Sequence, residues 1–280
     1  MSNKPYKGFE PKWLLTPAPA GSYRSIFRWG DPAFFKYPKE SLYKMMKEAF
    51  HMTDEDFRDY TDDIGFDQVS LPDHPSRIAP EHLEALKKIV GEEFVTTGDY
   101  ERLSVAYGCT GYDLLRLRHK QIDSLPDVVV YPDTTEQVEE LVRYAAEHKL
   151  PLYVYGGGSS VTRGVEPIKG GISLDMRKPF NKILSFNEVD QTITVQAGLS
   201  GPALEEALQD APNRFGAKRQ YTCGHFPQSF EYSSVGGWVV TRGAGQNSTY
   251  YGTIADICLL YTISEPTRHL RISYAVFCLK

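Results

Sequence analysis

Long apolar runs are absent from this 280-residue chain, and none approaches the roughly 20 residues that a membrane span needs. A secretory signal peptide is also missing, and the end of the chain is not a peroxisomal Ser-Lys-Leu signal. The cysteines are Cys109, Cys223, Cys258 and Cys278. They form no Cys-x-x-Cys pair and no disulfide-framework spacing. These absences predict a reduced, cytoplasmic protein without a transmembrane segment.

Excess positive charge is lacking as well. The net charge of −5 argues against nucleic-acid binding, which favours a basic face. The histidines are scattered rather than clustered, so no metal site is predicted. The balance of 41% hydrophobic and 24% charged residues is typical of a globular protein of one large or two ordinary domains. We therefore expect a small-molecule ligand.

The front of the chain, residues 1–120, is predicted to be an arm followed by helices. Residues 1–36 are rich in proline, glycine and aromatic residues, which favours an extended arm. Apolar residues at helical spacing then predict helices at residues 38–50, 81–90, 100–107 and 112–118. No catalytic signature lies in this region.

A β-α-β unit begins at residue 127. Asp127–Tyr131 reads as a strand, and Thr134 with Gln137 predicts a capping box that opens a helix to about His148. Leu152–Tyr155 is the second strand, and the connection should be right-handed with the two strands parallel.

Further elements follow this unit. Gly171–Asp175 is predicted as a third strand, and Ile183–Phe186 with Thr192–Val195 as a hairpin. Pro202–Leu208 is predicted as a short helix. Residues 121–257 therefore have α+β character.

Three glycines, Gly156–Gly158, follow the second strand directly. Glycine permits positive φ and a close approach of the backbone to a ligand. Consecutive N–H groups in such a turn can hold an anion, most often a phosphate. Val161 stands where a third glycine would complete the dinucleotide-binding fingerprint. The segment predicts a phosphate cradle of another kind, and a tight surface turn is the alternative.

A second cluster of glycine and serine lies within Cys223–Trp238, and Thr241–Gly245 continues it. Gly236 and Gly237 again allow close approach, while the serines add short hydrogen-bonding groups. Two such clusters predict one long ligand that is held at two places. A β-domain with glycine-rich turns is the alternative.

Five segments together resemble the flavin domain of the vanillyl-alcohol-oxidase type. They are Pro126–Asp133, Gly156–Ser160, Gly224–Ser229, Ser233–Trp238 and Thr241–Ala244. The similarity is greatest to the alkyldihydroxyacetonephosphate synthases and covers about residues 95–257. Arg28–Asp31 also resembles the start of that family. The resemblance implies a PCMH-type FAD-binding domain at 121–257, after the arm and helical region at 1–120, and its β-α-β subdomain precedes a partial second β subdomain.

The resemblance implies FAD as the cofactor. Some relatives carry a flavin-linked histidine just after the glycines, where this chain has Ser159, so we expect non-covalent FAD. The implied cofactor-binding residues are Val154, Tyr155, Gly156, Gly157, Gly158, Ser159, Ser160, Gln228, Ser229, Phe230, Glu231, Tyr232, Ser233, Ser234, Gly236, Gly237, Thr241, Arg242, Gly243 and Ala244. The first seven would surround the diphosphate. His225 has either a structural role or a contact with the isoalloxazine ring, and no catalytic residue is assigned.

Residues 258–280 do not resemble the family. They read as a divergent tail, such as shifted-frame sequence or the end of a fragment, and a short strand pair is the alternative. We therefore expect an incomplete chain without the family's substrate cap, which alone binds FAD weakly or not at all.

Three functions stay open at this point. The first is an ether-lipid synthase type of enzyme that acts on a lipid-like phosphate ester. The second is an FAD-linked dehydrogenase or oxidase of a 2-hydroxy acid or phenol. The third is a non-catalytic remnant that binds flavin or a partner. A homodimer is kept open in each case.

Overall fold

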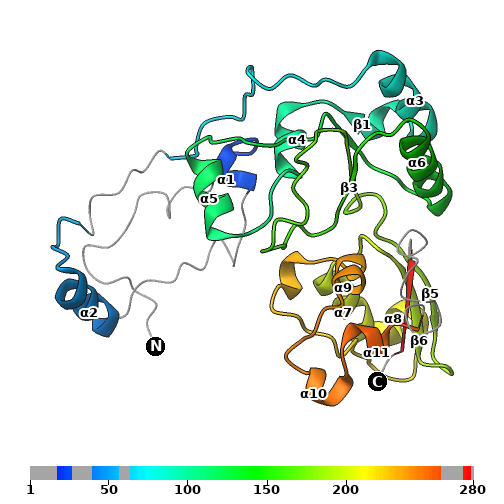
Figure 1. Cartoon of the computed structure of the whole chain (residues 1–280). Coiled ribbons are helices and arrows are strands. Elements are labelled where there is room, and N and C mark those ends of the chain that lie inside the picture. Colours follow the sequence, from blue (N-terminus) through cyan, green and yellow to red (C-terminus); the bar gives the residue numbers. More distant parts are fainter. Residues whose placement is uncertain (1–17, 27–39, 57–63, 260–273, 279–280) are drawn as a thin grey trace. The chain divides into compact units, whose positions relative to one another are not determined.

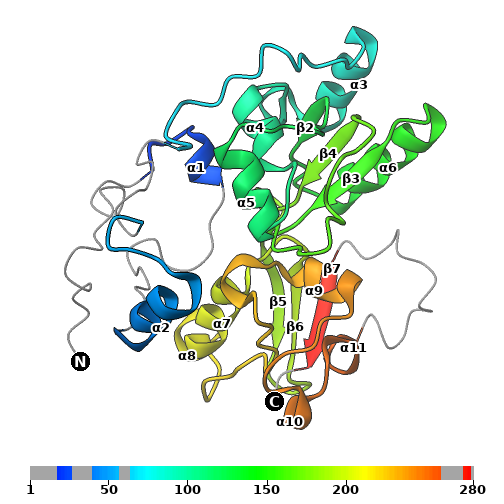
Figure 2. The same ribbon diagram turned by 60° about the vertical axis from the view of Figure 1, so that its left-hand side comes forward.

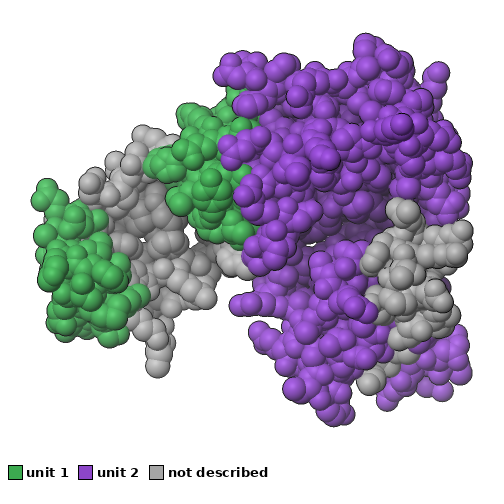
Figure 3. Space-filling view, viewed as in Figure 1, with its two compact units in different colours: residues 1–71, 109–122 green, residues 72–108, 123–280 purple. Residues whose placement is uncertain are grey.

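Figure 1 shows the computed structural model, which describes residues 18–26, 40–56, 64–259 and 274–278. The chain forms two compact units, distinguished by colour in Figure 3. The first unit comprises residues 1–71 and 109–122, and the second comprises residues 72–108 and 123–280. Every residue implied in cofactor binding belongs to the second unit.

The first unit contains three described helices. It contains α1 (Tyr23–Ile26), α2 (Glu40–Phe50) and α5 (Gly111–Arg118), so the helices predicted at 38–50 and 112–118 are confirmed. A capping box between Thr110 and Asp113 starts α5. The Arg28–Asp31 segment and most of the predicted arm lie outside the described residues.

A four-stranded sheet organises the first half of the second unit (Figure 2). Its strands are β1 (Val95–Thr96), β2 (Val128–Val130), β3 (Leu152–Tyr155) and β4 (Ile172–Asp175), in the order β1-β2-β4-β3. The predicted strands β2 and β3 are both parallel to β4, which lies between them. All four residues of β4 are buried, as expected of a central strand. In contrast, Val154 of the edge strand β3 is 60% exposed.

Helices cover this sheet. They are α3 (Pro80–Val90), η2 (Glu92–Phe94), α4 (Asp99–Ser104) and α6 (Thr135–Glu147). Leu86 of α3 and Leu141 of α6 are fully buried, in the same core cluster as Ile172 and Leu174 of β4.

The capping box predicted for α6 is half formed. The Thr134 hydroxyl accepts a hydrogen bond from the Gln137 amide at 3.2 Å. The Gln137 side chain accepts instead from the amide of Asp133, at 2.7 Å, and not from that of Thr134. The glutamine thus satisfies the N–H one residue before the cap.

A second, antiparallel sheet follows, in the order β5-β6-β7. The predicted hairpin is confirmed as β5 (Ile183–Asn187) and β6 (Thr192–Gln196). The third strand, β7 (Tyr274–Cys278), comes from the segment read as a divergent tail and pairs with all five residues of β6. The tail thus contributes one strand, whose partner is β6 rather than a second strand among the described residues of the tail.

Short helices complete the second unit (Figure 2). They are α7 (Gly201–Gln209), α8 (Ala211–Phe215), η3 (Phe230–Tyr232), α9 (Val235–Thr241), α10 (Ser248–Tyr251) and α11 (Ile254–Ile257). Their core combines Val195 of β6 with Leu204, Trp238 and Ile254, all buried. Among the described residues, no helix has both the length and the apolar character that crossing a bilayer requires.

Candidate functional site

The glycine segment, Gly156–Ser160, leaves the carboxyl end of β3. Gly158 has a φ of +70°, a left-handed conformation that favours glycine. Within the described part of the chain, the amides of residues 156–161 donate no hydrogen bond to another residue. Consecutive N–H groups without an acceptor in the chain can hold an anion, so this run of donors is available to a ligand.

The glycine segment lies directly against the serine segment, Gln228–Gly237. A Cβ atom added at Gly157 would overlap the carbonyl oxygen of Tyr232 and lie 2.5 Å from Cα of Ser233. A Cβ added at Gly156 would overlap the Ser234 hydroxyl. The absence of side chains therefore lets two segments that are distant in sequence meet at one place.

The serine hydroxyls hold this place together. The Ser233 hydroxyl, which is buried, accepts a hydrogen bond from the Trp238 indole at 2.6 Å and donates to the carbonyl of Ser229 at 2.8 Å. The Ser234 hydroxyl accepts from the Gly237 amide at 3.3 Å and caps α9. Sequence reasoning treated these hydroxyls as contacts to a ligand, whereas the structure also gives them partners within the chain.

The other implied residues lie around this contact. Gln228 and Glu231 are exposed, while Phe230 stacks on Trp238 with ring centroids 6.0 Å apart. Gly236 packs so closely on Ala197 that an added Cβ would lie 2.6 Å from the alanine methyl carbon. This close packing fixes the first turn of α9 against the end of β6.

The Thr241–Ala244 turn lies at the opposite end of α9 from Ser234. The Thr241 hydroxyl donates to the carbonyl of Gly237 at 2.7 Å, and an added Cβ at Gly243 would lie 3.5 Å from Nε2 of His225. The structure thus places this turn beside His225, and the glycine segment beside the residues that precede α9.

His225 is 1% exposed, and neither ring nitrogen has a hydrogen-bond partner among the described residues. Its ring packs edge-on against Trp238, with centroids 5.0 Å apart. Burial lowers the pKa of His225 to about 4, so the ring is neutral at pH 7. A buried polar group without a partner is costly, and a ligand or water at this ring would relieve that cost.

Sequence reasoning missed Asp175, Arg177 and Tyr131, which lie at or just after the carboxyl ends of the parallel strands, where the implied residue Tyr155 also lies. Asp175 ends β4 and pairs in register with Tyr155 of β3, while Tyr131 follows β2. The Asp175 carboxylate accepts three hydrogen bonds from the Arg177 guanidinium, at 2.5, 2.9 and 3.2 Å. Burial raises the pKa of Tyr131 to about 12, and the charge of Asp175 adds to the shift. Their position at or just after the ends of predicted strands could have identified them, because ligands bind at the carboxyl ends of parallel strands.

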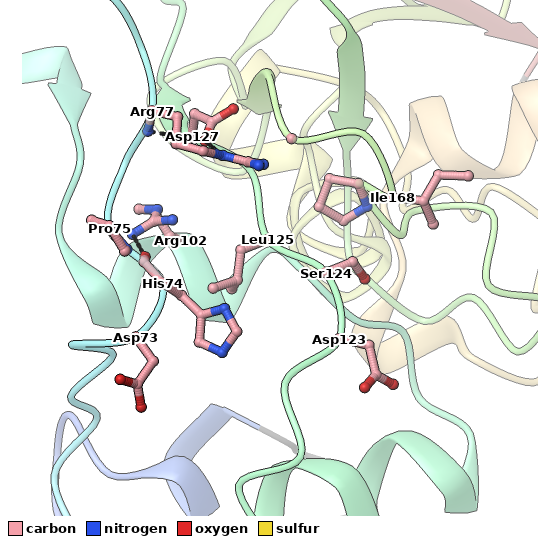
Figure 4. Close-up of a pocket in the computed structure, with 12 residues that line it drawn as sticks. Asp73, His74, Pro75, Arg77, Arg102, Asp123, Ser124, Leu125, Asp127 and Ile168 are labelled. Carbon is pink, nitrogen blue, oxygen red and sulfur yellow. Dashed lines mark hydrogen bonds and ion pairs between the residues drawn. The ribbon is translucent and has the colours of Figure 1, made fainter.

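A separate pocket of about 230 Å³ lies at the opposite ends of these strands (Figure 4). Asp127, just before β2, and Gly170, just before β4, line it together with Arg102. Buried Arg102 donates to the carbonyls of His74 and Pro126, at 2.8 Å each. None of the residues implied in cofactor binding lines this pocket.

Known proteins share the sequence and the fold of this region. The family described as FAD binding domain matches residues 126–267, ten residues beyond the limit of 257 expected from the motifs. The alkyldihydroxyacetonephosphate synthase of Dictyostelium discoideum is 32% identical over 201 residues, which are 71% of this chain and 31% of that protein.

Two further relatives extend the comparison. The mitochondrial D-lactate dehydrogenase [cytochrome] 1 of Saccharomyces cerevisiae is 27% identical over 186 residues, or 66% of this chain and 30% of that protein. A solved alkyldihydroxyacetonephosphate synthase superimposes with a TM-score of 0.66 at 29% identity, covering 73% of this chain and 40% of that one. The chain thus spans about a third of the length of these curated relatives.

Proposed function

This chain belongs to the family of FAD binding domains, and we propose that its FAD lies where the glycine segment meets the serine segment. The observation that carries this proposal is the run of unpartnered amides at residues 156–161, beside the contact of Gly157 with Tyr232 and Ser233. A diphosphate needs several N–H donors and close access to the backbone, and the segment fits both needs.

The remaining implied residues would hold the rest of the cofactor. The glycine segment, with Val154 and Tyr155, takes the diphosphate, and the serine segment and Thr241–Ala244 take the nucleoside and ring portions. Ser159 carries no group that links covalently to flavin, which supports non-covalent binding. When bound, FAD supplies the redox-active ring, and the protein supplies orientation and electrostatics.

For the reaction, we propose an alkyldihydroxyacetonephosphate synthase type of enzyme whose substrate is a lipid-like phosphate ester. The relative from Dictyostelium discoideum and the solved synthase support this proposal by their names and their identity to this chain. The second candidate is an FAD-linked dehydrogenase or oxidase of a 2-hydroxy acid, which the similarity to D-lactate dehydrogenase favours. A non-catalytic flavin-binding role is the third.

We also propose a cytoplasmic location, which the free thiols of Cys109 and Cys223 support. A homodimer stays a proposal that sedimentation analysis would test.

Titration of the purified chain with FAD tests the cofactor proposal. We expect weak but saturable quenching of flavin fluorescence, competed by ADP. A chain that shows no saturable binding at millimolar FAD would overturn it.

Assays of the FAD-loaded chain then separate the functions. Formation of an alkyl ether of dihydroxyacetone phosphate supports the first candidate, and dye reduction by D-lactate supports the second. Saturable FAD binding with neither activity supports the third.

A further inference from the structure

Arg177 follows β4 by two residues, at the carboxyl end of the parallel sheet where the glycine segment also begins. We infer that the Arg177 guanidinium contacts the FAD diphosphate and is a binding residue that the family motifs did not include. The inference rests on the proposed function, because it concerns the same cofactor site.

The first argument is the way in which Arg177 is held. Its Nε and Nη2 atoms donate to the buried carboxylate of Asp175, at 2.9 and 2.5 Å, and its own amide donates to the same carboxylate at 3.0 Å. These bonds fix the plane of the guanidinium. Nη1 takes part in no hydrogen bond with the residues that the structure describes, so its two N–H groups are available to a second anion.

The second argument is proximity to the glycine segment. The Arg177 guanidinium lies over the Tyr155 ring, with Cζ 4.8 Å from the ring centre. A Cβ added at Gly158 would overlap the hydroxyl of the same tyrosine. The Tyr155 ring therefore has the guanidinium over its face and Gly158 at its hydroxyl end. Because the Arg177 side chain is 42% exposed, a ligand can reach it.

The third argument is charge. A diphosphate carries two negative charges, whereas the implied cofactor residues contain one basic side chain, Arg242, and one acidic side chain, Glu231. Arg242 is the C-cap of α9, at the opposite end of that helix from Ser233 and Ser234, which lie against Gly157 and Gly156. Arg177 brings a cation to the end of the sheet where the amides of residues 156–161 are. A guanidinium that is already bound to a carboxylate on one edge suits a phosphate on the other.

Three variants test this inference. Arg177→Gln removes the charge but leaves the Asp175 carboxylate buried without its partner, which destabilises the folded protein. The double variant Asp175→Asn/Arg177→Gln removes both charges and keeps a neutral hydrogen-bonding pair. Arg177→Lys keeps the cation. Arg143→Gln, on the exposed side of α6, is the matched control.

Each protein is titrated with FAD, with ADP, which carries a diphosphate without the flavin, and with riboflavin, which carries the flavin without phosphate. Thermal unfolding of each protein without ligand checks its fold. We expect the double variant to bind FAD and ADP about 10- to 100-fold more weakly, with riboflavin binding unchanged. Arg177→Lys should recover part of the loss, and Arg143→Gln should match the wild type.

Two results would overturn the inference alone while the wild type binds FAD: a folded double variant with unchanged affinity for FAD and ADP, or an equal loss for riboflavin. A wild-type chain that binds neither FAD nor ADP would overturn the proposed function, and this inference with it.

Discussion

Adding one methyl group at Gly157 tests the contact between the two segments most directly. In Gly157→Ala the new Cβ overlaps the Tyr232 carbonyl oxygen and lies 2.5 Å from Cα of Ser233. Both are backbone atoms, so a rotamer change cannot relieve the clash and the segments must separate. Overpacking of this kind costs about 1–3 kcal/mol. For a unit of this size, that corresponds to a fall of about 2–12 °C in melting temperature.

The same substitution should weaken FAD binding, because it moves the amides that we propose for the diphosphate. We expect a loss of about tenfold or more in affinity, measured by flavin fluorescence. The matched control is Gly164→Ala, since the nearest atom to an added Cβ there is the Ser160 hydroxyl at 3.9 Å. If Gly157→Ala melts and binds FAD like the wild type, the two segments do not meet as described.

Three further predictions concern buried polar groups. Burial lowers the pKa of His225 to about 4, whereas in the unfolded chain its pKa is about 6.5. Between these pH values the imidazole is protonated in the unfolded chain and neutral in the native one. The free energy of unfolding should therefore fall by at most roughly 3 kcal/mol as the pH drops from 6.5 to 4. Urea unfolding at pH 7.5 and 4.5 measures this loss of stability, which should be smaller in His225→Phe. If the variant loses as much stability as the wild type, groups other than His225 cause the loss. Burial also raises the pKa of the Cys223 thiol to about 12, so peptide mapping after brief iodoacetamide treatment should find Cys223 unmodified in the native protein and modified in urea. Rapid native modification would contradict its burial. Finally, Arg102→Met leaves the carbonyls of His74 and Pro126 without their donor and should cost about 2–4 kcal/mol in urea unfolding, and an unchanged midpoint would show that these bonds contribute little.

The candidate site was only partly predictable from sequence. Glycines at 156–158, and again at 236 and 237, mark positions where backbone must approach something closely, and a sequence carries that information locally. The local sequence does not specify which atoms lie against these glycines. In the structure some of them belong to the chain itself, since Gly157 lies against Ser233 and Gly236 lies against Ala197. Arg177 belongs to none of the sequence motifs, and its place near the cofactor site follows from its position just after strand β4.

Periodicity, capping residues and turn residues in the sequence were enough to predict helices α3 and α6, the β5–β6 hairpin and the strand before the glycines, because each depends on interactions between near neighbours. The order of the strands depended on the whole sheet. β4 takes the centre because its residues are buried on both faces, and β7 completes the second sheet from residues that resembled no motif. Tertiary structure also decided which polar groups meet: Asp175, Tyr155 and Arg177 come together because parallel strands end at one edge. A local pattern indicates which face of a helix or strand is apolar. Only the packing of the whole unit determines which other element covers that face.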